Sequence, residues 1–600
     1  MKYDYDLLII GGGSGGLSLA SGAAQLGVKV LLVDKALLGG DCLHYGCVPS
    51  KSLIKSGKIA QYTREADHYG LKALEPKLDW KDITERITGI QDKIQEHDSA
   101  KRFRALGCDV VFGTAKFVDD HEVEIELNHS ISEQLENLGT WKLGNKKSIK
   151  VSSKKIVIAT GSRPNVPPIE GLKEVGFITN ETVFSMEKQP KSMLIIGGGV
   201  IAVEIAQAFQ RLGTQVTIAI RGEHLLDRED QEVIEVIENR LKKEGVEILN
   251  KVTFEKFELN SGVNSAAPQK VLHYTKDGKD EVQSFDTVLV ATGRKANLEL
   301  DLEKAGVKYD RVIPVDKKCR TNRKHILAIG DVNGQVPFTH GANYEAGAVL
   351  TNEILHVPSK VNDSSIGYTV FTDPEIASIG LNEKRAQEQG VWVKVIESRF
   401  ASQDRALAEG ENDGLIRILI DKKDRIMGCQ IASPRAGEMI REWQLAISQK
   451  IKLSKLARST FIYPTFGEMS KWAAGSHYAP KLFAPKVKKI LQFLFRYRGK
   501  SGFQTFFQST RFPKNFLMKW RRLLKNSRKG LQKKYISKRF FIFWGTGIGG
   551  IGLMSPHTFV CFGRWILGGF GNGEGIFTVR SSIISFGGCS SEVIFLQKMR

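Results

Sequence analysis

The sequence predicts an α/β protein with two Rossmann-like domains, followed by a basic tail. Two observations indicate the Rossmann-like domains. A glycine-rich βαβ pattern occurs twice, and three further apolar segments end in glycine-containing turns, where open α/β sheets bind ligands. The tail follows from charge, because residues 481–600 hold 23 of the 87 Lys and Arg but two of the 66 Asp and Glu. The first 480 residues are balanced in charge, so the excess positive charge belongs to the tail.

The first βαβ unit covers residues 5–35, "YDLLIIGGGSGGLSLASGAAQLGVKVLLVDK". Gly11 permits a tight turn, Gly13 lets the backbone approach a pyrophosphate, and Gly16 allows the helix and strand to pack closely. Asp34 ends the second strand, where a carboxylate can bind a ribose hydroxyl. This complete context predicts a dinucleotide site rather than a merely glycine-rich turn.

The second unit covers residues 192–222 and has three fingerprint residues, Gly197, Gly199 and Ala202. Its second strand ends at Arg221 without a carboxylate, so nothing there repels a 2′-phosphate and Arg221 can pair with one. This pattern favours NADPH, with NADH as the alternative. Arg221 is alternatively a solvated charge at a strand end, with nearby Arg228 as the cation.

Three other segments contain a strand that ends at a glycine turn. Two of them, "IVIATGSRP" (156–164) and "VLVATGRKAN" (288–297), end in Ala-Thr-Gly and mark domain borders, and "ILAIGDVNG" (326–334) ends in Gly-Asp. Asp331 on the last turn can accept hydrogen bonds from cofactor hydroxyls, whereas the alternative is an Asx-turn or a helix cap. Its position at a glycine-rich strand end favours the cofactor.

The segment "GGDCLHYGCVPSK" (39–51) places Cys42 and Cys47 five residues apart. In a regular helix such residues have Cα atoms about 8–9 Å apart, whereas a disulfide needs less than about 7 Å. The chain must therefore turn between them, for which Gly46 gives the freedom, and Pro49 suits the first turn of a helix that carries Lys51. A disulfide that closes so small a loop adds little stability and is typically reducible and catalytic. Two buried thiols or half a metal site are the alternatives. We predict no metal site, because no second Cys/His pair with ligand spacing lies nearby.

With "GGGVIAVE" (197–204) and "FTDPEIASIG" (371–380), these motifs make residues 3–478 resemble the FAD-dependent pyridine-nucleotide disulfide oxidoreductases. The resemblance implies two Rossmann-like domains, for FAD and NAD(P)H, and an α+β dimerisation domain. It divides the chain into an FAD domain (1–165 and 294–350), an NAD(P)H domain (166–293), a dimerisation domain (351–478) and an unassigned tail (479–600). A homodimer is also implied, in which one subunit completes the site of its partner.

The resemblance also implies the site residues. FAD would bind at Gly11, Gly13, Gly16, Asp34, Lys51, Thr160, Gly161, Asp331, Thr339 and Ala342. NAD(P)H would bind at Gly197, Gly199, Ala202, Glu204, Arg221 and Gly293. Lys51 and Glu204 would form an ion pair beside the flavin, where Lys51 stabilises negative charge on the reduced ring. Electrons would pass from NAD(P)H through FAD to a Cys42–Cys47 disulfide. Cys47 would face the flavin and Cys42 would meet the substrate. The helix start and nearby cations are expected to lower the pKa of Cys42 or Cys47.

One departure concerns the acid/base group. Disulfide-reducing members of the family end in His-Pro-Thr-x-x-Glu, whereas this chain reads "YPTFGE" (463–468), with Tyr463 in place of the histidine and Glu468 retained. A phenol with a pKa near 10 is a poorer proton shuttle at pH 7 than an imidazole near 6.5. Loss of a positioned acid/base costs about 10²–10⁴ in rate, so this departure argues against ordinary dihydrolipoamide or glutathione turnover. Tyr463 is alternatively a packed interface aromatic.

The electron acceptor stays open at this point. Mercuric reductases resemble this chain in having a tyrosine at that place and an arginine before Arg-Glu-Asp, here residues 228–230. Yet Cys561 and Cys589 are not adjacent, and no Cys-x-x-Cys domain precedes the first strand. We therefore predict a mercuric reductase-like NAD(P)H oxidoreductase whose acceptor is a metal ion, a quinone or a disulfide. Alternatives are a dihydrolipoyl dehydrogenase-type enzyme, and a membrane- or nucleic-acid-associated redox sensor with little turnover. His44, between the cysteines, either assists a thiol or is a solvated loop residue.

The tail follows different rules. Residues 481–539 interleave Lys and Arg with Phe, Leu and Trp, which predicts a basic amphipathic helix on anionic lipid, with a nucleic-acid-binding arm as the less favoured alternative. Residues 540–563 carry no Asp, Glu, Lys or Arg and have the length of one membrane span, but six glycines and a proline argue against it. Seven cysteines are too few for a secreted disulfide scaffold, and the apolar run at Leu7–Ile10 is too short for a signal peptide. We expect a cytoplasmic protein whose tail contacts the inner face of a membrane.

Overall fold

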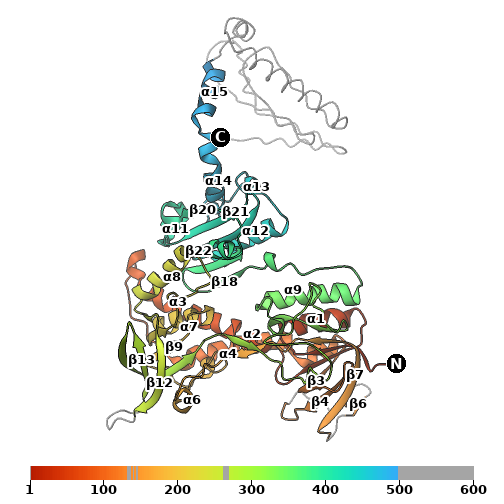
Figure 1. Ribbon diagram of the computed structural model, residues 1–600. Coiled ribbons are helices and arrows are strands. Elements are labelled where there is room, and N and C mark those ends of the chain that lie inside the picture. The colour runs from red at the N-terminus through yellow and green to blue at the C-terminus, as the bar shows by residue number, and fades with distance from the viewer. Residues whose placement is uncertain (1, 132–136, 139–140, 143–145, 261–268, 497–600) are drawn as a thin grey trace, which may run out of the picture. The chain divides into compact units, whose positions relative to one another are not determined.

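Apolar runs near the N-terminus build a parallel sheet, shown at the lower right of Figure 1. The computed structural model describes residues 2–131, 137–138, 141–142, 146–260 and 269–496. The parallel order is β3 (Cys108–Phe117), β2 (Val30–Asp34), β1 (Tyr5–Ile10), β7 (Ser148–Ile158) and β17 (Ile326–Ala328). The long strand β7 also pairs with β4 (Glu122–Leu127), which joins it to β3 in antiparallel fashion. A short hairpin, β5 (Asn137–Leu138) and β6 (Trp141–Lys142), lies between β4 and β7 in the chain.

Helices pack on this first sheet and carry the cysteine segment. α1 (Ser14–Gln25) packs against α9 (Thr339–Val349), two helices more than 300 residues apart in sequence. The segment after β2 forms α2 (Gly40–His44) and α3 (Cys47–Arg64), followed by α4 (Trp80–Asp98) and α5 (Ala100–Ala105). Side chains such as Leu8, Ile9 and Val157 are fully buried in the core of this domain.

The second domain repeats the βαβ arrangement. Its parallel sheet has the order β11 (Glu247–Leu249), β10 (Gln215–Ala219), β9 (Ser192–Ile196) and β15 (Thr287–Val290), with helices α6 (Leu172–Val175), α7 (Val200–Arg211) and α8 (Gln231–Lys243). An antiparallel sheet of β12 (Thr253–Asn260), β13 (Gln269–Lys276) and β14 (Lys279–Phe285) adjoins it. The chain enters through β8 (Ser162–Pro164) and leaves through β16 (Arg294–Ala296). These two strands pair, so the two crossings lie side by side.

The third domain is an antiparallel sheet with helices on it. The sheet order is β18 (Tyr368–Val370), β19 (Glu375–Gly380), β22 (Ile426–Ser433), β21 (Leu415–Ile420) and β20 (Lys394–Arg399). The helices are α10 (Glu383–Glu388), α11 (Asp404–Glu409), α12 (Ala436–Ser448), α13 (Leu453–Leu456) and α14 (Glu468–Leu482). Trp443 of α12 is fully buried in the core between sheet and helices. α14 continues four residues beyond the predicted domain end at 478.

The Arg-Glu-Asp segment of residues 228–230 joins the second and third domains. Buried Glu229 accepts hydrogen bonds from Tyr368, Ser378 and Gln430. Buried Asp230 accepts from the backbone of Glu383 and Lys384, the first residues of α10. The Arg228 carbonyl oxygen accepts from the Asn382 side chain at 2.7 Å, so all three residues of this motif make contacts between domains, although Arg228 is exposed.

Residues Met1–Leu482 form one compact unit and Phe483–Arg600 a second. In the second unit the structure describes α15 (Pro485–Arg496). Each helix in the described part of the chain is too short or too polar to cross a membrane. The uncharged segment 540–563 and most of the basic segment lie outside the described residues.

Candidate active site

The two cysteines occupy the break between α2 and α3. Cys42 lies within α2, the chain leaves the helix at Tyr45 and Gly46, and Cys47 is the first residue of α3. Both are free thiols in this structure. The Cys47 Sγ lies 3.5 Å from the Thr339 Oγ1 at the start of α9. The turn predicted from the five-residue spacing is therefore present, and α9 brings a distant hydroxyl to the thiol.

The two thiols have opposite electrostatic roles. A hydrogen bond from Cys42, with help from Thr339 and the Lys51 ammonium, lowers the pKa of Cys47 to about 6. The same hydrogen bond, together with burial, raises the pKa of Cys42 above its ordinary range. Cys47 is therefore the thiolate of the reduced pair and Cys42 the protonated donor, and the thiolate is the form that attacks or binds metal.

Lys51 lies one helical turn after Cys47 and pairs with the second domain. Its Nζ is 2.9 Å from the Glu204 Oε2 on α7. The other carboxylate oxygen of Glu204 accepts from the backbone N–H of Phe371 at 2.8 Å, and the Phe371 ring lies 4.5 Å from the Lys51 Nζ. Glu204 is almost completely buried, and Phe371 contacts both members of the ion pair. The Lys51 ammonium is close enough to the thiols to act on the pKa of Cys47.

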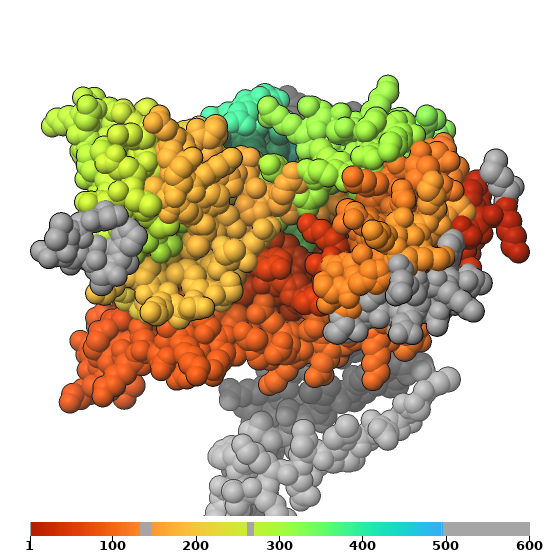
Figure 2. Space-filling view, turned by 90° about the horizontal axis from the view of Figure 1, so that it is seen from below, coloured from red at the N-terminus to blue at the C-terminus, as the bar shows by residue number. Residues whose placement is uncertain are grey.

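A cavity of about 1030 Å³ runs along the carboxyl edge of the first sheet to these thiols. Of the predicted FAD residues, nine line it: Gly11, Gly13, Asp34, Lys51, Thr160, Gly161, Asp331, Thr339 and Ala342. Gly16 lies inside α1 below them. Asp34 accepts from the backbone of Gly12 at 2.5 Å and of Ala36 at 2.8 Å, and burial raises its pKa. Figure 2 shows the N-terminal segments, in red, set back in a hollow between parts of the first two domains.

Two glycines allow the backbone segments beside this cavity to pack closely. Gly11 has φ +115°, and a Cβ there would come within 2.2 Å of the Ala159 carbonyl oxygen. Gly40, just before the cysteines, has φ +60°, and its Cβ would lie 2.7 Å from the Gly13 Cα. The cysteine segment thus packs directly on the fingerprint turn. An extended dinucleotide fits this cavity, which is lined by Asp34, Asp331 and both cysteines.

The predicted NAD(P)H residues lie at the corresponding edge of the second sheet. Gly197 has φ +120° and contacts Ala291, two residues before Gly293. Gly199 caps α7 and faces open space, and Ala202 is buried in that helix. Arg221 and Arg228 are both exposed in the segment that follows β10. Among these predicted residues only Glu204 lines the cavity that contains the thiols.

Tyr463 and Glu468 do not line the cavity of their own chain. Tyr463 is 66% exposed, and its hydroxyl donates to the Asp404 Oδ2 at 3.0 Å. That hydrogen bond raises the pKa of the phenol. Glu468 begins α14, and within the described residues of one chain its Oε2 is buried without a hydrogen-bond partner. Tyr463 is therefore accessible at the surface, whereas the Glu468 Oε2 is buried in its own chain.

The sequence reasoning missed a polar network around Arg294. Its guanidinium donates to the Asp41 Oδ1 at 3.0 Å, beside Cys42, and to the Ser162 Oγ at 2.8 Å. Ser162 in turn donates to the Asp331 Oδ2 at 2.5 Å. Asn180 also contacts Asp41 and Arg294. Arg294 directly follows an Ala-Thr-Gly turn, and this position in the sequence could have indicated that the residue lies at the site.

His44 lines the cavity but is bound elsewhere. Its Nε2 lies 2.9 Å from the Leu38 carbonyl oxygen, so this contact holds the turn before α2. The structure gives His44 a hydrogen bond to the backbone rather than to either thiol.

Comparison with protein families decides the class of the molecule. Residues 5–346 match the model described as "Pyridine nucleotide-disulphide oxidoreductase", and residues 366–474 match the dimerisation domain of the same family. The chain belongs to the pyridine nucleotide-disulphide oxidoreductase family. It is therefore a flavin-dependent oxidoreductase that uses FAD and a pyridine nucleotide, and its third domain is a dimerisation domain, which indicates a homodimer. The predicted fold class and family are confirmed.

Two curated relatives of similar identity carry different activities. The chain is 32% identical over 475 residues to the mercuric reductase of Staphylococcus aureus, covering 78% of this chain and 82% of that one. It is 33% identical over 475 residues to a dihydrolipoyl dehydrogenase of Bacillus subtilis (strain 168), covering 78% and 95%. Among solved structures, the HOCl-induced flavoprotein disulfide reductase RclA from Escherichia coli, in a Cu(II) complex, aligns with TM-score 0.66 and 24% identity over 79% of this chain and all of that one. The chain described here resembles all three proteins, and their names do not identify its electron acceptor.

Proposed function

We propose that this enzyme oxidises NADPH and delivers the two electrons through Cys42 and Cys47 to a thiophilic metal ion, as a mercuric reductase-like enzyme. The proposal rests on the state of Tyr463, which stands in place of the expected histidine. Its phenol is hydrogen-bonded to Asp404, and the raised pKa keeps the phenol protonated at neutral pH. A disulfide acceptor needs protons delivered to its leaving thiolates, and an imidazole suits that task better than this phenol.

The reaction with a metal ion needs no such proton delivery. NADPH and Hg(II) give NADP⁺, a proton and Hg(0), so the reduced metal takes up two electrons and no proton. FAD, when bound, accepts the hydride and supplies the electrons. The chain's own contribution is a pair of sulfur ligands, which suit soft metal ions. Cys47 enters as thiolate, and Cys42 releases its proton when it binds the metal.

NADPH is proposed as the hydride donor on electrostatic grounds. Strand β10 ends at Ala219, exposed Arg221 follows two residues later with no carboxylate between them, and exposed Arg228 lies further along the chain. A 2′-phosphate placed at this strand end meets guanidinium groups that can bind it bidentately. Steady-state kinetics with both coenzymes tests this. We expect kcat/KM to favour NADPH, and Arg221→Ala to reduce that preference more than Arg228→Ala. A wild-type preference for NADH contradicts it.

An acceptor screen tests the main proposal. The full-length enzyme is mixed with NADPH and Hg(II), Cu(II), a quinone or lipoamide, and flavin reoxidation is followed by stopped flow. We expect fast reoxidation and Hg(0) release with Hg(II), abolished by Cys42→Ser and retained by the control Cys108→Ala, which changes a buried thiol of the first domain. Lipoamide turnover at a rate equal to that with Hg(II) supports the dihydrolipoyl dehydrogenase alternative instead. A stable reduced enzyme with every acceptor supports the redox-sensor alternative.

The second unit supports a location at a membrane surface. In α15, Ile490, Leu491 and Phe495 are exposed, and the same helix carries Lys486, Lys488 and Lys489 without an acidic residue. An exposed apolar face beside a basic one binds the surface of an anionic bilayer, whereas nucleic acid needs no apolar face. Co-sedimentation with phosphatidylglycerol vesicles, but not with phosphatidylcholine vesicles, is expected. Ile490→Glu should weaken it, and Gln492→Glu is the matched control. Equal binding to both vesicles, or binding to DNA alone, contradicts this location.

A further inference from the structure

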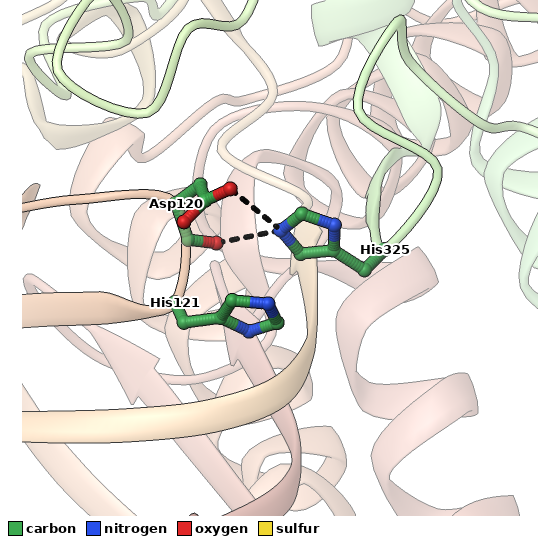
Figure 3. Close-up of side chains that lie close together, drawn as sticks. All are labelled: Asp120, His121 and His325. Atoms are coloured by element: carbon green, nitrogen blue, oxygen red, sulfur yellow. Dashed lines mark hydrogen bonds and ion pairs between the residues drawn. The ribbon is translucent and has the colours of Figure 1, made fainter. Parts of the chain in front are cut away.

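A cluster of metal-binding side chains lies on the first domain, away from the thiols (Figure 3). Asp120 and His121 belong to the turn between β3 and β4, and His325 directly precedes β17. One ligand atom from each of the three residues lies within 4.8 Å of the other two, and all three side chains are partly exposed. Two imidazoles and one carboxylate form a typical ligand set for a divalent transition metal.

The backbone holds both histidines in place from the same strand. The Ser153 N–H of β7 donates to the His121 carbonyl oxygen at 2.9 Å, and the Ile156 N–H donates to the His325 carbonyl oxygen at 3.0 Å. The Asp119 carboxylate also caps the turn by accepting from the backbone N–H groups of His121 and Glu122, both at 2.7 Å. Two segments that are far apart in the sequence therefore present their imidazoles from one strand.

The hydrogen bonds of the rings show which nitrogens can bind metal. The His121 Nδ1 lies 2.8 Å from the Ser153 carbonyl oxygen, a contact that places the proton on Nδ1 and leaves a lone pair on Nε2. Metal-ligating histidines almost always donate their other N–H in this way. The His325 Nε2 lies 2.8 Å from the Asp120 carbonyl oxygen and 3.8 Å from the Asp120 carboxylate.

The two rings stack in this structure, with centroids 4.1 Å apart and planes 13° from parallel. A metal ion binds in the plane of an imidazole, so stacked rings cannot both bind it until one tilts. The His121 ring is bound to strand β7 and also packs on the Tyr3 ring, whereas the His325 ring is hydrogen-bonded to the turn residue Asp120, so His325 is the ring that tilts.

We propose that Asp120, His121 and His325 bind one divalent transition-metal ion of the Zn(II), Ni(II) or Cu(II) type. The ion takes the lone pair of the His121 Nε2, an oxygen of the Asp120 carboxylate and a ring nitrogen of His325, which exchanges its hydrogen bond for the metal. Water completes the coordination on the exposed side. The ion thereby ties the β3–β4 turn to the start of β17.

This site is separate from the redox centre. Ile158 pairs with Ile10 next to the fingerprint glycines, and Ser153 lies five residues earlier on the same strand, which is about 16 Å away at about 3.3 Å per residue. The cluster thus lies at the opposite edge of the sheet. Metal bound there is held by the fold and is not the acceptor of the electrons.

Metal titration of the full-length flavoprotein tests the proposal. The parent protein carries Cys42→Ser and Cys47→Ser, so that the redox thiols do not bind the probe. Equilibrium dialysis with Ni(II) should show one equivalent whose affinity falls at least tenfold in His121→Gln and in His325→Gln. His129→Gln, which changes an exposed histidine in the turn after β4, is the matched control and should bind as the parent does. Flavin content and the metal-free melting temperature report folding of each variant. If one His variant does not fold, the other alone is enough to test the site.

Spectroscopy separates this site from adventitious binding. Cu(II) bound to the parent should give an electron paramagnetic resonance signal with two coordinated ring nitrogens, reduced to one in each His variant. Ni(II) should also raise the melting temperature of the parent but not of the variants, because an ion that binds the folded state stabilises it. Unchanged Ni(II) affinity in both His variants, or a Cu(II) signal with two nitrogens in them, overturns the proposal.

Discussion

The reduced form of the cysteine pair gives the sharpest prediction. With a pKa of about 6, Cys47 is about 90% thiolate at pH 7, whereas an ordinary thiol with a pKa near 8.5 is about 3% thiolate. A thiolate next to the flavin gives a long-wavelength charge-transfer absorbance. In the two-electron-reduced wild type this absorbance should be full above neutral pH and fall with a midpoint near pH 6, since a lowered thiol pKa means that the charged form is lost only in acid.

The causes of the low pKa rank the variants. The hydrogen bond from Cys42 is the largest favourable contribution, that from Thr339 is smaller, and the Lys51 charge is smaller again. The midpoint should therefore rise most in Cys42→Ala, less in Thr339→Val and least in Lys51→Met. Cys42→Ala cannot form the disulfide, so its absorbance is titrated with oxidised flavin. Cys108→Ala is the control and should titrate as the wild type does.

Two results would refute this reasoning. A wild-type midpoint at or above pH 8 means that the surroundings do not stabilise the Cys47 thiolate. An unchanged midpoint in Cys42→Ala means that the thiol pair does not share its proton as the geometry indicates.

Three further predictions concern the acid/base position and the buried charges. Tyr463→His should raise lipoamide turnover by about 10² or more, because it restores an acid/base group; a steady-state rate equal to that of the wild type contradicts the role given to this position. Glu345 is completely buried and has a pKa raised to about 7 by burial, so the folded protein keeps a proton that the unfolded chain loses above pH 4.5. The stability of the fold should therefore decline by about 3 kcal/mol as the pH rises from 4.5 to 7, and Glu345→Gln should flatten this decline in melting curves, whereas an identical pH dependence excludes it. Arg417 is 2% exposed among Asp230, Glu232 and Glu383, and Arg417→Met should cost about 3 kcal/mol in urea unfolding because carboxylates lose their partner. The exposed Arg435 pairs with Glu409, so Arg435→Met should cost less than about 1 kcal/mol, and equal costs for the two variants contradict the role of burial.

Local patterns in the sequence were sufficient for the parts of the site that are contiguous in the chain. The fingerprint around Gly11 and the turn between Cys42 and Cys47 depend on backbone geometry within a few residues, and glycine spacing encodes that geometry directly. For the same reason the two Rossmann-like domains were predictable, since each βαβ unit is local. The Lys51–Glu204 pair is different, because 153 residues separate its members. This pair was predicted from the resemblance to the family and not from the spacing of the two residues.

The contacts that the sequence did not reveal join segments that are close only after folding. Arg294 reaches Asp41, 253 residues away, and nothing in either local pattern specifies the other. The Arg-Glu-Asp motif at residues 228–230 shows the same limit, because its local pattern did not reveal its distant contacts. Its resemblance to mercuric reductases suggested only a branch of the family. In the structure Glu229 and Asp230 hold the second domain on the third, so a buried interdomain role explains these residue types without reference to any substrate. A motif that resembles one branch of the family can therefore reflect packing between domains, and the proposed acceptor rests instead on Tyr463, whose exposed phenol is hydrogen-bonded to Asp404 and can be replaced by histidine as a direct test.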